Sequence, residues 1–207
     1  MRKGRRKGFR RQFGLDRSGP PPRQTRSGEP LRPWTIPNAV GYARFAALPA
    51  FLYLAFSSGD GRDAAATVIF LAVAAGDYLD GFLARATGQY SRMGALLDPL
   101  VDRLTVLAGV VVCWKFELLP RWALAILAAR EVVTLIVAQL ALRRGLDLEI
   151  NWVGRWSVWL TMGGIFLALV TAAWIAPAMF FAGLVGSLLA SVLYLRTGLA
   201  AMRRNEQ

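Results

Sequence analysis

Four aspartates near the middle of the chain are the residues whose type and spacing are best suited to chemistry. They fall into two pairs, Asp77 with Asp80 and Asp98 with Asp102. In a helix, residues three or four positions apart share a face, so each pair presents two carboxylates together. Four negative charges gathered in an apolar setting would repel one another and lose hydration. Divalent cations remove that cost, and ligands that are all oxygen favour Mg²⁺ or Mn²⁺.

The rest of the composition narrows the chemistry further. The 207 residues contain no histidine and one cysteine, which disfavours a zinc site. Without imidazole, acid–base work near neutral pH must come from carboxylates, lysines or metal-bound groups. Cys113 lies in an apolar run, and we interpret it as a small apolar filler.

Small residues continue the faces that carry the aspartates. Gly81, Ala84 and Gly94 each lie four positions from one of the four acids. Such positions let a flat group or a phosphate approach the backbone. Close packing between helices is the alternative explanation. Because the acids lie beside them, we favour a ligand site, in which Arg85 could reach a phosphate. Arg85 could also act only as a topology charge.

The elements that position these residues are long apolar stretches. Hydrophobic residues make up 55% of the chain, and the mean hydropathy is +0.39, more apolar than an ordinary soluble domain. About six stretches approach the ~20 residues that cross a bilayer. Their approximate ranges are 37–57, 63–86, 92–115, 120–143, 152–174 and 177–199. Lipid offers no partners to free backbone groups, so we predict an all-α integral membrane protein with six transmembrane helices.

The distribution of positive charge predicts an orientation. With a cytoplasmic N-terminus, the opposite side carries only Arg62, Lys115 and Arg121. The cytoplasmic side then carries the N-terminal tail with Arg85, Arg92, Arg143, Arg144, Arg155, Arg203 and Arg204. This is the positive-inside bias of membrane proteins. It predicts that both termini are cytoplasmic and that the metal site faces the cytoplasm.

The chain has two regions of different composition. Residues 1–31 are basic and rich in glycine and proline, without apolar periodicity, and we expect a disordered cytoplasmic tail. The tail could bind acidic lipid headgroups, or it could serve only as a topology signal. We do not expect a nucleic-acid partner. Residues 32–203 form the predicted six-helix domain.

The complete pattern resembles a known family. It reads Asp77-x2-Asp80-Gly81-x2-Ala84-Arg85-x8-Gly94-x3-Asp98-x3-Asp102. This resembles the signature of the CDP-alcohol phosphatidyltransferases at every fixed position. Pro37-Asn38 and Arg44 are similar to the N-terminal positions of that family. The resemblance covers roughly residues 35 to 200.

The resemblance implies an enzyme that moves a substituted phosphate from a CDP-linked donor, such as CDP-diacylglycerol, to an alcohol and releases CMP. Asp77, Asp80 and Asp98 would hold two Mg²⁺ or Mn²⁺ ions, with Asp102 as a metal neighbour and the general base. The residues implied for donor binding are Asn38, Arg44, Asp80, Gly81, Ala84, Arg85 and Gly94. A homodimer in a bacterial-type inner (plasma) membrane is implied as well.

The sequence does not decide which alcohol is the acceptor. Phosphatidylglycerophosphate synthases often carry a Lys-Thr pair where this chain has Ser157-Val158. A small dianionic acceptor, glycerol-3-phosphate, would therefore lack one expected cation. The residues after Asp102 and around Arg155 look closer to cardiolipin synthases of the actinobacterial type. We favour phosphatidylglycerol as the acceptor, with glycerol-3-phosphate as the alternative and inositol phosphate third. Arg130 and Arg155 are candidate acceptor-binding residues, although Arg130 with Glu131 could be a structural ion pair.

Two rival classes remain. An intramembrane prenyltransferase also uses magnesium bound to aspartates, but it has no need for this glycine and arginine spacing. A cation transporter should place its acids along a path near mid-membrane. Here the acids gather at one helix corner, around residues 77–102, which favours an enzyme.

Overall fold

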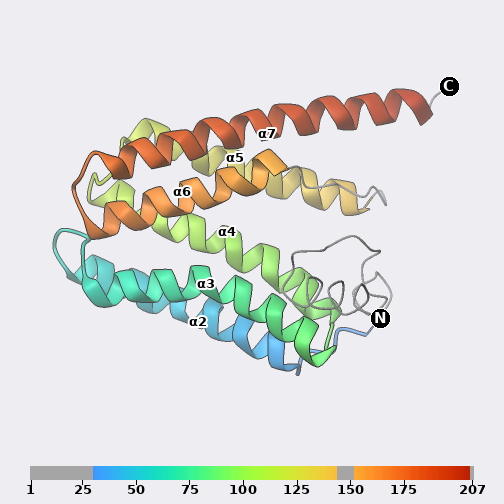
Figure 1. The fold of residues 1–207 in the computed structure, drawn as a ribbon, viewed down its shortest axis with the longest axis horizontal. Coiled ribbons are helices and arrows are strands. Elements are labelled where there is room, and N and C mark those ends of the chain that lie inside the picture. Colours follow the sequence, from blue (N-terminus) through green and yellow to red (C-terminus); the bar gives the residue numbers. More distant parts are fainter. Residues whose placement is uncertain (1–29, 144–151, 206–207) are drawn as a thin grey trace, which may run out of the picture. The chain divides into compact units, whose positions relative to one another are not determined.

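The computed structural model describes residues 30–143 and 152–205, and within these ranges all regular structure is helical. The helices, coloured from blue to red in Figure 1, are α2 (Ile36–Ser57), α3 (Ala64–Thr87), α4 (Arg92–Lys115), α5 (Arg121–Arg143), α6 (Trp152–Val170) and α7 (Ile175–Asn205). The predicted all-α class is confirmed. The start of α7 differs from the prediction because Pro177 lies inside the first turn, where its missing N–H costs nothing.

Three of the helices begin at a capping side chain. The Oγ1 of Thr35 accepts a hydrogen bond from the backbone N–H of Asn38, at 3.3 Å, at the start of α2. Asp63 accepts from the N–H of Ala66 at 2.7 Å before α3. Ser91 accepts from the N–H of Gly94 at 2.9 Å before α4. These oxygens satisfy N–H groups that have no partner within the helix.

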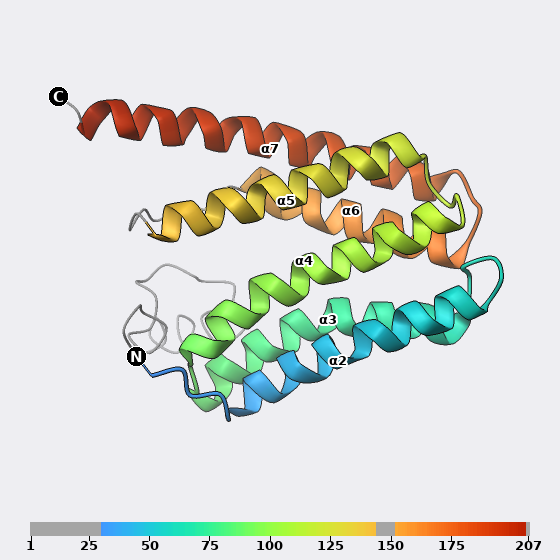
Figure 2. The same ribbon diagram turned by 180° about the vertical axis from the view of Figure 1, so that it is seen from behind.

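The chain divides into two compact units, and the first contains the aspartates. It takes the chain up to Tyr53 and residues Val68–Val106, so it holds most of α2 and α3 and the first part of α4. The rings of Phe51 and Phe70, both buried, lie 5.2 Å apart and join α2 to α3. In the views of Figures 1 and 2 these two helices run side by side.

The second unit takes Leu54–Thr67 and the chain from Leu107 onward. Within it, α6 and α7 pack along each other, as both ribbon views show. Glycines allow this approach. A Cβ on Gly164 would lie 2.5 Å from the backbone nitrogen of Phe180, and one on Gly183 would meet the backbone of Thr161. The two helices therefore touch backbone to backbone, as small residues permit in membrane helices.

Three described helical segments are long and apolar enough to cross a membrane: α2, α3 and residues Ile175–Leu193 of α7. The apolar part of α6, Trp156–Val170, is shorter. Charges interrupt α4 at Asp98 and Asp102, and α5 at Arg130 and Glu131, which lowers their apolar content. These apolar helices suit a membrane protein.

Adjacent glycines on α6 give a test of the α6–α7 contact. Gly164→Ala should lower the free energy of unfolding by about 1–3 kcal/mol, because the new methyl group meets backbone that cannot move aside. Gly163→Ala is the matched control, since its methyl group would meet only the end of the flexible Met179 side chain. Unfolding of both variants in mixed detergent micelles checks this. Equal stability of the two variants would contradict backbone contact at Gly164.

Candidate functional site

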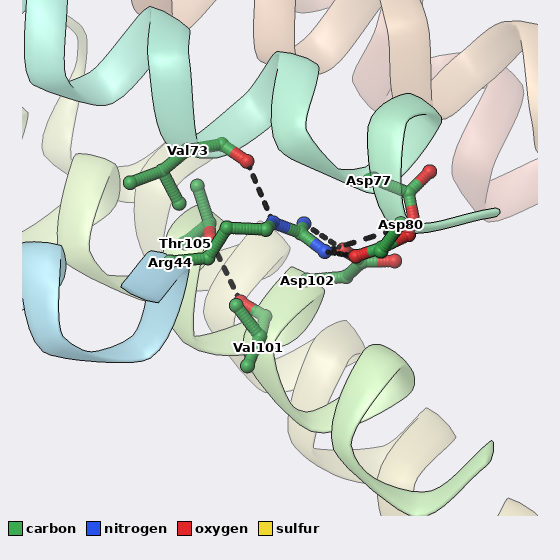
Figure 3. A network of polar contacts seen from close by, with 7 residues as sticks. All are labelled: Arg44, Val73, Asp77, Asp80, Val101, Asp102 and Thr105. Carbon is green, nitrogen blue, oxygen red and sulfur yellow. Dashed lines mark hydrogen bonds and ion pairs between the residues drawn. The ribbon is translucent and has the colours of Figure 1, made fainter. Parts of the chain in front are cut away.

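A guanidinium lies among three of the predicted aspartates in the first unit (Figure 3). Arg44 on α2 donates from Nη1 to Asp80 Oδ2 on α3, at 2.7 Å, and from Nη2 to Asp102 Oδ1 on α4, at 2.6 Å. Its Nη1 is also 3.9 Å from Asp77 Oδ1. One side chain thus joins three helices through two short, charge-assisted hydrogen bonds.

Arg44 is held by the backbone as well as by the acids. Its Nε donates to the carbonyl oxygen of Val73 at 2.9 Å, one turn before Asp77 on α3. The Arg44 side chain is 4% exposed, so its charge is nearly removed from water. A buried charge is tolerated when it is paired and hydrogen-bonded. The contacts to Val73, Asp80 and Asp102 meet that requirement.

Gly76 makes room for the Arg44 side chain. A Cβ built on Gly76 would lie 2.6 Å from Arg44 Cδ and 2.8 Å from Cγ. The aliphatic part of the arginine therefore crosses α3 at a residue that has no side chain. The sequence reasoning missed Gly76 as a site residue, although a glycine directly before Asp77 was a visible signal.

The carboxylates differ in their access to solvent. The Asp80 side chain is 4% exposed, whereas those of Asp77 and Asp102 are 55% and 45% exposed. Asp98 is half-buried, and the charges of Asp80, Asp77 and Asp102 act on its carboxyl group. The structure therefore brings Asp77, Asp80 and Asp102 together around Arg44, with Asp98 near enough for their charges to act on it. Asp80 lies at the buried bottom of this group of acids, and the side chains of Asp77 and Asp102 are exposed to a ligand.

Asn38 connects the start of α2 to the start of α4. Its Nδ2 donates to the carbonyl oxygens of Arg32, at 3.1 Å, and Pro33, at 3.0 Å, and its Oδ1 accepts from Ser91 Oγ at 2.9 Å. The amide thus uses both donors and one acceptor lone pair within the protein. Ser91 was another residue that the sequence reasoning missed, although serine before a helix is a capping signal.

The predicted small residues have two kinds of neighbour. A Cβ on Gly94 would lie 2.8 Å from Asn38 Oδ1, so this glycine serves close packing of α4 against α2. A Cβ on Gly81 would lie 3.3 Å from Arg85 Nη1, so the Arg85 guanidinium lies over that glycine. Ala84 is half-buried on α3, one turn after Asp80. The structure thus groups Gly81 with Arg85 beside the acids.

The donor chemistry of the cluster suits a divalent cation. The four aspartates outnumber the one arginine among them and leave a net negative charge, and every acidic ligand atom is oxygen, the type that Mg²⁺ and Mn²⁺ prefer. Among the described residues, no three acidic, histidine or cysteine side chains are placed to share one ion. The carboxylates of Asp80 and Asp102 converge on Arg44 instead.

The predicted acceptor residues lie in the second unit. Arg130 on α5 donates from Nε to Ser191 Oγ on α7 at 3.3 Å, and its Nη1 forms an ion pair with the neighbouring Glu131. Both charged side chains are largely buried, at 13% and 8% exposed. Arg155 lies on α6, and its side chain falls outside the described part. The ion pair considered for Arg130 and Glu131 is present, and their role in acceptor binding stays a prediction.

Comparisons with known proteins identify the family. The sequence model described as CDP-alcohol phosphatidyltransferase matches residues 34–193, which include every predicted site residue. A Streptomyces coelicolor protein named cardiolipin synthase (CMP-forming) is 36% identical over 149 residues, 69% of this chain and 69% of that protein. A putative cardiolipin synthase of Mycobacterium tuberculosis is 35% identical over 58% of this chain, which spans 57% of that relative.

A third relative carries a different name. The Bacillus subtilis protein named CDP-diacylglycerol--glycerol-3-phosphate 3-phosphatidyltransferase is 26% identical over 61% of this chain and 72% of its own length. The family is generally dependent on divalent metal ions. The family match extends from the segment before α2 to residue 193, within α7, and includes the aspartate cluster and Arg44. The resemblance seen in the sequence is therefore confirmed, and the chain belongs to the CDP-alcohol phosphatidyltransferase family.

Proposed function

We propose that this chain transfers a phosphatidyl group from CDP-diacylglycerol to phosphatidylglycerol, forming cardiolipin and releasing CMP. The observation that carries the proposal is the aspartate cluster of α3 and α4, within a chain whose family match covers residues 34–193. The relatives named cardiolipin synthase, at 36% and 35% identity, support phosphatidylglycerol as the acceptor.

Ser157 provides a structural argument on the acceptor. It is 3% exposed on α6, and its Oγ lies against the position that a Cβ on Gly186 of α7 would take. A lysine at position 157 would have to separate two closely packed helices. This position therefore serves packing here and supplies no cation to a small dianionic acceptor. The alternative, glycerol-3-phosphate, is favoured by the name of the Bacillus subtilis relative.

The proposed reaction is one displacement at phosphorus. The acceptor hydroxyl oxygen attacks the phosphorus that carries the diacylglycerol, the bond from that phosphorus to the bridging oxygen breaks, and CMP leaves with the electron pair. Asp102, whose side chain is 45% exposed, accepts the hydroxyl proton. Asp77, Asp80 and Asp98, with Asp102 beside them, would hold two Mg²⁺ or Mn²⁺ ions, whose chemistry neutralises charge on the pyrophosphate.

Donor binding is assigned to the residues around this cluster. Arg85, lying over Gly81, can contact the pyrophosphate, and Ala84 leaves space beside it. Asn38, which is 2% exposed, serves donor binding by positioning the start of α4 through Ser91 and Gly94. Arg44 contributes positive charge at the buried bottom of the site, beside Asp80. Arg130 and Arg155 remain the proposed acceptor contacts.

We further propose six membrane spans, with both termini and the metal site on the cytoplasmic side of a bacterial-type plasma membrane. The positive-inside charge distribution supports this orientation. Residues 1–29 of the proposed basic tail lie outside the described residues; at the described end of that segment, the carbonyl of Leu31 accepts from Met93 N–H at 3.0 Å. The homodimer implied by the family is part of the same proposal.

One assay tests the acceptor. Purified protein is incubated with CDP-diacylglycerol, Mg²⁺ or Mn²⁺, and phosphatidylglycerol, glycerol-3-phosphate or inositol phosphate in parallel. We expect CMP release and a lipid with the mass of cardiolipin only in the phosphatidylglycerol reaction. Phosphatidylglycerophosphate as the main product would select the alternative acceptor. Absence of CMP with every alcohol would contradict the proposed activity.

Asp102→Asn tests the general base. The asparagine keeps an oxygen that can accept from Arg44 Nη2, so the contact between α2 and α4 should survive. Turnover should fall by roughly 10²–10⁴-fold, the usual contribution of general acid–base catalysis, while donor binding changes little. Single-turnover kinetics and equilibrium binding of CDP-diacylglycerol separate the two effects. Retained turnover would remove Asp102 as the base.

Asp77→Ala tests the metal role of the exposed acid. Asp77 is 55% exposed and 3.9 Å from Arg44, so its removal should cost little stability. We expect lower activity together with a higher Mg²⁺ concentration for half-maximal rate. Asp60→Ala, on the loop between α2 and α3, is the matched control for loss of an exposed aspartate. Wild-type activity that persists in a chelator would show that the metal assignment is wrong.

A further inference from the structure

Arg44 has a relation to the aspartates that its proposed part in donor binding does not explain. Its guanidinium contacts Asp80 on α3 and Asp102 on α4 at 2.7 and 2.6 Å, and these acids are two of the four proposed metal ligands. We propose that Arg44 is the built-in counterion of the cluster, so that a divalent cation binds only in competition with this guanidinium for Asp80 and Asp102. The inference rests on the metal role proposed for these acids.

Competition follows from distance and charge. A divalent ion such as Mg²⁺ needs its oxygen ligands within about 2.1 Å of one point. Asp80 Oδ2 and Asp102 Oδ1 are instead directed to two different nitrogens of Arg44. In addition, a positive charge this close repels a second cation, and burial of Arg44 to 4% exposure strengthens that repulsion. A shared ion must therefore either draw a carboxylate away from Arg44 or bind the second oxygen of each carboxylate against the repulsion of the guanidinium.

The competition is permanent because Arg44 is anchored independently of the acids. Its Nε donates to the Val73 carbonyl at 2.9 Å, and its Cγ and Cδ pass over Gly76. If a carboxylate turns to an ion, the guanidinium stays beside the site and cannot swing out to water at little cost. Gly76 is in this view a positioning residue, because any side chain there would displace the Arg44 stem.

The opposite possibility makes the opposite prediction. If Arg44 only held Asp80 and Asp102 in the right places for a metal, its removal would weaken metal binding, because the acids would lose their positions. If it competes, its removal strengthens metal binding. The sign of the change in metal affinity therefore decides between the two roles, and no lipid substrate is needed to measure it.

The experiment measures Mn²⁺ binding to the full-length protein in detergent micelles, from the electron paramagnetic resonance signal of free Mn²⁺. Arg44→Gln should tighten the Mn²⁺ dissociation constant by roughly ten- to hundredfold, the range implied by the loss of charge-assisted hydrogen bonds. In chelator, the Arg44→Gln protein should unfold at a lower temperature than wild type. Added Mn²⁺ should raise its unfolding temperature by more than it raises that of wild type. Unchanged or weaker Mn²⁺ binding by a folded Arg44→Gln protein would overturn the proposal.

Gly76→Ala keeps every charge and decides the matter even if Arg44→Gln does not fold. Its methyl group displaces the Arg44 stem, so Mn²⁺ should bind severalfold more tightly than to wild type. Gly41→Ala is the matched control on α2, since its methyl group meets only the side-chain end of Leu97, at 2.7 Å. We expect wild-type affinity for it. Equal tightening in both alanine variants would indicate general loosening and overturn the proposal.

The outcomes also separate this inference from the proposed function. If wild type binds no Mn²⁺ and neither Arg44→Gln nor Gly76→Ala gains binding, both the metal role of the acids and the competition fail. If wild type binds Mn²⁺ and the variants match it, only the competition fails. If the variants bind more tightly while the lipid assay gives no CMP, the competition stands and the proposed reaction fails.

Discussion

The ion pairs of the buried Arg44 with Asp80 and Asp102 are the interaction on which the first unit depends. Acids in an apolar helix bundle are costly, and four of them on α3 and α4 would push those helices apart. The guanidinium from α2 offsets part of this repulsion and joins all three helices at one point. The need to neutralise charge and the need to hold the helices together are therefore met by one residue.

Small residues make this arrangement possible, because charged groups can pair only where the helices come close. Gly76 admits the Arg44 stem, and Gly94 brings α4 against Asn38. At each place a methyl group would occupy space that a polar side chain of α2 already fills. The glycines near the acids thus serve helix packing and the site together, since close packing is what brings the carboxylates within reach of one another.

The packing of α6 on α7 in the second unit follows the same rule and bears on the acceptor. Ser157 lies against Gly186, so a residue position that could have carried a cation is instead committed to helix contact. Arg130 is paired with Glu131 and linked to Ser191. Both contacts join a helix of this unit to α7, by packing from α6 and by a hydrogen bond from α5.

The sequence by itself determined the all-helical class, the approximate bounds of the helices, the four aspartates and the family. These features are local: apolar stretches, helical spacing and a motif within residues 77–102 can all be read along the chain. The division of roles among the acids could not be read in this way. Asp80 is buried and Asp77 is exposed, although they lie one turn apart, because Asp80 accepts a 2.7 Å hydrogen bond from the buried Arg44 whereas Asp77 approaches it only to 3.9 Å.

Contacts across long sequence separations were decided by tertiary structure alone. Arg44 meets Asp102 from 58 positions away, and Asn38 meets Ser91 from 53 positions away. The spacing of residues within one helix does not predict which residue of another helix will lie against them, because that contact depends on how both helices rotate and pack. The sequence thus identified the four acids. The packing of α2 against α3 and α4 determined that Asp80 and Asp102 pair with Arg44.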